Sequence, residues 1–147
     1  QLVDKQGQPF VIDLKWSGST KYKKKEVKEG KALQLASYAW MLKSADDVWA
    51  PGAYFMLAQG ELLTDDHRFN TPYPIGSDLS AQEVWQLGSK TWTNMFTQVH
   101  QGELEVSGLL DEKDLKEERE QAGLMYVQPP CHFCDFGKLC GKTRAVA

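Results

Sequence analysis

Long apolar runs, cysteine and excess positive charge are all scarce in this sequence of 147 residues. No stretch approaches the ~18 consecutive apolar residues that a membrane-spanning helix needs. The three cysteines all fall within one short segment near the end of the chain, and the formal net charge is −3. These absences argue against a membrane span, a disulfide framework across the domain and a uniformly basic nucleic-acid binder.

What is present is ordinary for a globular domain, with 41% hydrophobic and 25% charged residues. The opening stretch QLVDKQGQPFVIDLKW is typical of a hairpin, with a polar turn around Gly7. Its first arm is very short. We therefore expect the chain to be the C-terminal part of a longer protein, with the N-terminal part of its core missing.

The second arm of this hairpin carries two charges in an otherwise apolar strand. Side chains alternate between the two faces of a strand, so Asp13 and Lys15 are predicted to be neighbours on one face. The apolar set on the other face is Phe10, Ile12, Leu14 and Trp16. A salt bridge on the wet side of an edge strand would explain the pair. The alternative is a catalytic pair, with a carboxylate that holds a metal beside an ammonium that stabilises charge, but this spacing alone is a weak signal for it.

A lysine-rich stretch, SGSTKYKKKEVKEGK, follows this strand directly. Its glycines and serines predict a loop or a partly ordered, solvated segment. A flexible basic loop beside a phosphodiester site would also serve as a phosphate clamp. The candidate DNA-binding residues are Lys21, Lys23, Lys24 and Lys25.

The rest of the chain predicts a mixed α/β order. Residues 32–45 lack helix breakers and predict a helix, and residues 53–58 and 61–65 predict two strands. A long helix is expected over 77–104, with Ser80 or Asp78 as its cap. The charged residues 111–120 are consistent with a solvated helix or a loop. On the first of these helices Gln34 and Tyr38 lie four residues apart and share a face.

The motifs VIDLKW and QLASY together resemble the RecB-like branch of the PD-(D/E)xK nuclease superfamily. In that branch a strand carries Asp-x-Lys and the next helix carries Gln-x-x-x-Tyr. The resemblance implies a restriction-endonuclease-like α/β core, a mixed sheet flanked by helices. It assigns Asp13 as a metal-binding carboxylate, Lys15 as the catalytic lysine, and Gln34 and Tyr38 as the helix motif.

The resemblance also implies a cofactor and a mechanism. Mg²⁺ or Mn²⁺ prefers oxygen ligands, which Asp13 and the backbone carbonyl of Leu14 would provide. Lys15 would orient a water or stabilise developing negative charge, and Gln34 and Tyr38 would contact DNA or fix the lysine. The family places a further metal-binding aspartate on the preceding strand. Asp4 lies in a turn, a common structural place for aspartate, so we expect that ligand before Gln1 and little or no activity from this chain alone.

The cysteines Cys131, Cys134 and Cys140 form a C-x₂-C-x₅-C pattern within a knuckle at 129–142. Such spacing is typical of metal or redox sites, and thiolates select zinc or iron–sulfur clusters. The pattern is similar to the end of AddB-type and Cas4-type nucleases, where a distant upstream cysteine completes a [4Fe–4S] cluster. Two alternatives stay open for this segment. One is zinc, although His132 is badly placed as a fourth ligand, and the other is a site without metal.

The resemblance therefore implies a metal-dependent DNA nuclease of RecB type, an exonuclease acting in DNA repair or recombination. Its expected partners are DNA and a helicase subunit or fused helicase domain, in a cytoplasmic, nucleoid-associated setting of a bacterium or phage. Two alternatives stay open at this point. One is a degenerate DNA-binding module of the same fold, and the other is an unrelated zinc-knuckle interaction protein.

Overall fold

The computed structural model describes residues 2–5, 7–72, 74–106, 109–128, 131, 134–136 and 139–140. The chain divides into two compact units, residues 1–86 and 87–147. The first unit holds the sheet and the candidate site. The prediction that residues 1–147 form part of a single nuclease domain stays a prediction.

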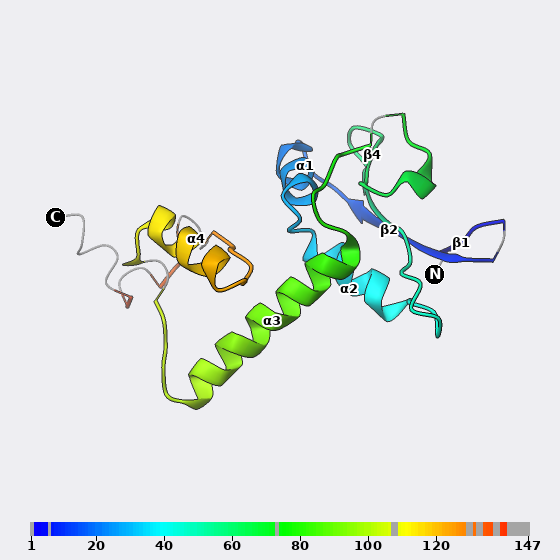
Figure 1. Ribbon diagram of the computed structural model, residues 1–147. Coiled ribbons are helices and arrows are strands. Elements are labelled where there is room, and N and C mark those ends of the chain that lie inside the picture. The colour runs from blue at the N-terminus through cyan, green and yellow to red at the C-terminus, as the bar shows by residue number, and fades with distance from the viewer. Residues whose placement is uncertain are drawn as a thin grey trace. The chain divides into compact units, whose positions relative to one another are not determined.

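The first unit is built on a four-stranded sheet with the order β1-β2-β3-β4 (Figure 1). Its strands are β1 (Leu2–Val3), β2 (Pro9–Lys15), β3 (Gly52–Met56) and β4 (Glu61–Leu63). β1 pairs with β2 and β3 pairs with β4 in antiparallel fashion, whereas β2 and β3 run parallel. A parallel pair needs a crossover, and helices supply it here. This mixed sheet with flanking helices confirms the predicted restriction-endonuclease-like α/β class.

The turn between β1 and β2 confirms the predicted hairpin. The Asp4 side chain accepts a hydrogen bond from the Gln8 backbone amide at 2.8 Å, and Gly7 adopts a φ of +80°. An aspartate that bonds to the backbone of its own turn is a structural residue, and glycine reaches positive φ without strain.

The lysine-rich stretch forms helix α1 (Lys21–Lys28), so the prediction of a loop there was wrong. Two features favour the helix over a solvated loop. Lysine has good helix propensity, and Lys23 pairs with Glu26 three residues later. Val27 is 3% exposed and anchors one face in the core. Gly30, at a φ of +62°, follows the end of α1 before α2 (Leu33–Met41) begins.

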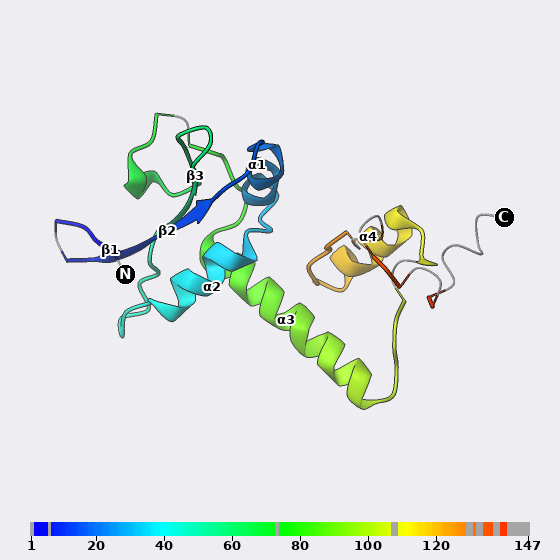
Figure 2. The same cartoon turned by 180° about the vertical axis from the view of Figure 1, so that it is seen from behind.

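The core of the first unit lies between α1, α2 and one face of the sheet (Figure 2). Its buried cluster consists of Val27, Leu35, Tyr54, Met56 and Leu63. A Cβ placed on Gly52 would lie 3.4 Å from the Cβ of Leu35, so glycine lets α2 approach β3 closely. Helix α2 also lies against β2, which carries the Asp-x-Lys motif.

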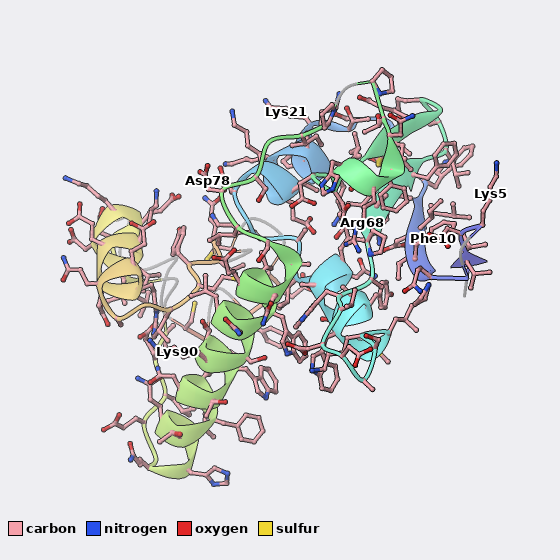
Figure 3. All side chains as sticks on the ribbon, turned by 45° about the vertical axis from the view of Figure 1, so that its right-hand side comes forward. Lys5, Phe10, Lys21, Arg68, Asp78 and Lys90 are labelled. Atoms are coloured by element: carbon pink, nitrogen blue, oxygen red, sulfur yellow. The ribbon has the colours of Figure 1, made fainter. Side chains whose placement is uncertain are left out.

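A short segment after β4 supports the other side of the hairpin. The 3-10 helix η1 (His67–Phe69) begins after Asp66, which accepts hydrogen bonds from the Arg68 backbone and guanidinium. The ring of Phe69 meets Phe10 edge-on at 5.9 Å, and both Phe10 and Arg68 are labelled in Figure 3. Burial raises the pKa of Asp66, but the Arg68 hydrogen bonds outweigh it and lower the pKa overall.

The remaining helices are α3 (Ala81–His100) and α4 (Glu112–Gln121), which confirms the long predicted helix and makes the charged segment helical. Ser80 caps α3 as predicted: its hydroxyl accepts from the Glu83 backbone amide at 3.3 Å, and its own amide donates back to the Glu83 carboxylate at 2.7 Å. Asp111 caps α4 by accepting from the Lys113 amide. Among the described residues, no helix combines the length and the apolar character that crossing a membrane requires.

Candidate functional site

The charged pair of β2 lies on the covered face of the sheet. The Asp13 and Lys15 side chains are 15% and 26% exposed, whereas Leu14 is 59% exposed and Trp16 is 83% exposed. The ion pair therefore lies on the less exposed face of β2 and not on the face that solvent reaches. Partial burial of charge is costly unless the surroundings compensate for it, so this placement calls for a specific set of partners.

Those partners form one connected row that includes all four residues of the predicted catalytic set. Lys15 Nζ lies 3.0 Å from Asp13 Oδ2 and donates to Gln34 Oε1 at 2.8 Å. Gln34 Nε2 in turn donates to the Tyr38 hydroxyl at 2.9 Å. The strand supplies the two charges at alternate positions, and one face of α2 supplies the two polar groups. This set is called the catalytic row below.

Asp13 keeps an oxygen that no hydrogen bond satisfies among the described residues. Its Oδ2 atom is buried, and the 3.0 Å approach of Lys15 Nζ is an ion pair without hydrogen-bond geometry. A buried carboxylate oxygen of this kind has capacity left for a hard cation, which is the donor chemistry that Mg²⁺ and Mn²⁺ select. The residue therefore fits the predicted metal ligand.

The backbone carbonyl of Leu14 fits the same role. The Val11 amide bonds to Pro51 of the segment before β3, and the Lys15 carbonyl accepts from Leu57 just after it. Alternate residues of a strand direct their backbone groups to the same side, so the Leu14 carbonyl points to the opposite edge. The described β1 pairs only with Pro9 and Phe10, which leaves that edge without a described strand beside Leu14.

A second charged cluster lies beside the catalytic row, and sequence reasoning missed it. The buried Tyr54 of β3 is the register partner of Asp13, and its hydroxyl donates to Glu26 Oε1 at 2.7 Å. Glu26 Oε2 lies 2.5 Å from Lys23 Nζ. The Nζ atoms of Lys15 and Lys23 lie 5.5 Å and 4.7 Å from the centroid of the Tyr54 ring.

The electrostatics of this cluster keep Tyr54 neutral. Burial first, then the hydrogen bond and charge of Glu26, and then the charge of Asp13 raise the pKa of Tyr54 well above its ordinary range. One signal in the sequence could have found the pair. A tyrosine in a strand otherwise made of core residues needs a partner for its hydroxyl, and Glu26 is one of only two acids among the lysines of α1 and its end.

Three of the four lysines predicted to contact DNA have acidic partners. Lys23 pairs with Glu26, Lys24 with Glu61 at 2.6 Å, and Lys25 with Glu29 at 3.7 Å. Lys21 is exposed at the start of α1, where Figure 3 labels it, and none of the ion pairs of the described residues includes it. Lys21 is therefore the member of the set whose charge is most available to a phosphate.

The cysteines do not gather into a metal site in the described part of the chain. Cys131 and Cys140 are half-buried, and Cys134 is exposed. No three His, Cys, Asp or Glu side chains among the residues described could hold a metal ion together. His132 and most of the remaining knuckle at 129–142 lie outside the described residues.

Comparison with known families agrees with the geometry of the catalytic row. The family model of the PD-(D/E)XK nuclease superfamily matches residues 1–141. The chain belongs to the PD-(D/E)XK nuclease superfamily. Neither a curated protein nor a solved structure gives a significant match.

Membership of the PD-(D/E)XK nuclease superfamily supports the coarse features of the predicted function. It implies a nuclease, hence a hydrolase with a DNA substrate, and nucleases of this superfamily typically use divalent metal ions. It also argues against an unrelated zinc-knuckle protein, because the matched range includes both the Asp-x-Lys strand and the cysteine segment.

Proposed function

We propose that this PD-(D/E)XK protein is a metal-dependent DNA nuclease and that the catalytic row is its active site. The observation that carries the proposal is the position of the Lys15 ammonium. It is held between the Asp13 carboxylate and the Gln34 amide oxygen on the covered face of the sheet. A salt bridge that served only stability would not need a polar helix face built around it.

The metal would be Mg²⁺ or Mn²⁺, held by Asp13 and the backbone carbonyl of Leu14 together with ligands from outside this row. When bound, such an ion lowers the pKa of a coordinated water and neutralises charge on the scissile phosphate. Asp13 would then exchange its ion pair with Lys15 for the metal, which leaves the ammonium available to the substrate.

The other residues of the row act on charge and position. Lys15 offers the ammonium that stabilises negative charge as it develops on the phosphate oxygens. Gln34 holds that ammonium through Oε1 and is itself oriented because its Nε2 donates to Tyr38. The Lys15 ammonium can only donate, so it selects the orientation in which Gln34 Oε1 faces the lysine. The Tyr38 hydroxyl then accepts from Nε2 and holds the amide in that place.

We further propose the finer identity of a RecB-type exonuclease that acts in DNA repair or recombination. The Asp-x-Lys strand followed by Gln-x-x-x-Tyr on the next helix supports this branch. A helicase subunit or fused helicase domain would deliver the DNA in a cytoplasmic, nucleoid-associated setting. Lys21 would contact the DNA backbone from the start of α1, with Lys24 and Lys25 as weaker contributors because glutamates pair with them.

The cysteine segment contributes no step to this mechanism. The described residues offer no ligand group there, so a [4Fe–4S] cluster on Cys131, Cys134 and Cys140 stays a prediction, with zinc as the alternative. Iron and sulfide analysis of anaerobically purified protein tests it. Stoichiometric zinc without iron would contradict the cluster.

The test of the proposed function is DNA cleavage by the complete gene product. Linear and circular DNA are compared with Mg²⁺, Mn²⁺ or a chelator, using wild type, Lys15→Ala and the control Lys43→Ala. Lys43 is a matched control because it pairs with Asp47 on the surface of the same unit. We expect metal-dependent cleavage that Lys15→Ala abolishes and Lys43→Ala preserves, and an exonuclease spares the circular DNA.

Folded protein that binds DNA but cleaves neither substrate would favour the degenerate DNA-binding module instead. Cleavage that survives Lys15→Ala would show that the catalytic row is not the active site.

A further inference from the structure

Two ion pairs lie beside the ring of one buried tyrosine at the site, and each places its lysine over that ring. Asp13 with Lys15 and Glu26 with Lys23 both lie around Tyr54, and both lysine Nζ atoms lie over its ring. Tyr54 itself is 0% exposed and remains neutral. The charges in this neighbourhood therefore balance in two separate pairs, one on the strand and one on α1.

The second pair is fixed by the core in a way that an ordinary surface pair is not. One oxygen of Glu26 accepts from the Tyr54 hydroxyl, and the other oxygen holds Lys23. Burying a phenol hydroxyl is costly unless it is bonded, so the core of the unit dictates where the Glu26 carboxylate lies. The carboxylate in turn dictates where the Lys23 ammonium lies.

We propose that Glu26 is a positioning residue that neutralises Lys23, so that Lys15 is the ammonium that meets the scissile phosphate. The proposal rests on the proposed nuclease function. Without Glu26, Lys15 and an uncompensated Lys23 would face one ring beside the substrate site. They would repel each other in a partly buried setting, and Lys23 would compete with Lys15 for the phosphate in an unproductive position.

This role differs from direct DNA binding by Lys23 and from simple support of the fold. A freed Lys23 would add a phosphate contact, so DNA binding would become tighter while turnover fell. Damage to the fold would weaken binding and turnover together. The two explanations therefore predict opposite signs for the change in affinity.

The experiment compares Glu26→Gln, Lys23→Gln and the double variant in the complete gene product. Glutamine keeps an oxygen acceptor for Tyr54 and removes only the charge. Asp47→Asn is the matched control, because Asp47 is exposed and pairs with Lys43, which lies outside the proposed DNA-binding set of the same unit. The dissociation constant for a DNA duplex is measured with chelator present over a range of salt, and single-turnover cleavage is measured with metal.

We expect Glu26→Gln to lower the cleavage rate about 3- to 10-fold. It should also tighten DNA binding and steepen the salt slope by about one phosphate contact. Adding Lys23→Gln should bring rate, affinity and slope back to those of Lys23→Gln alone, whereas Asp47→Asn should change none of them.

Weaker or unchanged DNA binding by Glu26→Gln, or no recovery in the double variant, would overturn the inference. The binding measurements decide this even if wild type cleaves nothing. Absent cleavage by wild type would instead reject the proposed function, so the two failures are distinguishable.

Discussion

The connected row from Lys15 through Gln34 to Tyr38 predicts a graded series of activity losses. Gln34→Leu removes both of its hydrogen bonds but keeps a helix-forming side chain of similar size. Among the partners that the described residues offer, Lys15 then keeps Asp13 and the Tyr54 ring. Tyr38→Phe leaves the Lys15 to Gln34 bond in place and frees only the far end of the amide. The expected order of loss is therefore Lys15→Ala, then Gln34→Leu, then Tyr38→Phe.

The magnitudes follow from the kind of bond that each change removes. Loss of a single charge-stabilising donor costs about 10²- to 10³-fold in turnover, which sets the scale for Lys15→Ala. A hydrogen bond from a charged donor contributes about 1.5–3 kcal/mol, equivalent to about 10- to 150-fold for Gln34→Leu. The neutral bond to Tyr38 contributes about 0.5–1.5 kcal/mol, equivalent to about 2- to 13-fold. Because the bonds of Gln34 to Lys15 and to Tyr38 are only partly buried, both losses should lie toward the lower end of these ranges.

Single-turnover cleavage of linear DNA at saturating Mg²⁺ measures the series, with a thermal melt of each variant as the folding control. Gln34→Leu combined with Lys15→Ala should lose no more activity than Lys15→Ala, because the amide acts through the lysine. A Tyr38→Phe loss larger than that of Gln34→Leu would refute the reasoning. Such a result would mean that Tyr38 contacts the substrate itself.

Three further changes test the core, the tyrosine and the basic helix. Leu35→Ala should cost about 2–5 kcal/mol in urea unfolding, because Leu35 is 6% exposed in the core, whereas exposed Leu33→Ala should cost far less. Because folding raises the pKa of Tyr54 above its ordinary 10.0, the unfolded chain ionises first and stability falls as pH rises above 10. Tyr54→Phe has no hydroxyl to ionise at this position, so its free energy of unfolding should fall less than that of wild type between pH 9 and 11. An equal fall in both proteins would contradict the raised pKa of Tyr54. Lys21→Ala should flatten the salt dependence of DNA binding by about one phosphate contact. An unchanged slope would show that Lys21 does not contact the DNA.

The local pattern of the sequence predicted the two pairs that make up the catalytic row, and the family resemblance joined them into one set. Alternation in β2 places Asp13 beside Lys15, and the four-residue spacing in α2 places Gln34 beside Tyr38, because strand and helix periods are fixed by the backbone. The hairpin, the Ser80 cap and the mixed α/β order likewise follow from short-range signals. The resemblance of these motifs predicted the PD-(D/E)XK nuclease superfamily, which the family comparison confirms.

The lysine-rich segment shows where local reasoning fell short. Glycine and serine before Lys21 predicted a loop, but the helix forms because Val27 is buried and Lys23 and Lys25 find glutamates within one turn. Burial of a single apolar residue in a charged run depends on what the rest of the chain places beneath it. That information is tertiary, so propensity was the weaker guide here.

The sequence by itself determined which residues share a strand face or a helix face, because those relations depend only on the backbone period. Only the tertiary structure decided that the charged face of β2 is the covered one, since this depends on α2 packing against β2 and β3. Only the tertiary structure joined Tyr54 to Glu26, which lie 28 positions apart in the chain. Partners so distant meet through strand register and helix packing, which no local periodicity encodes.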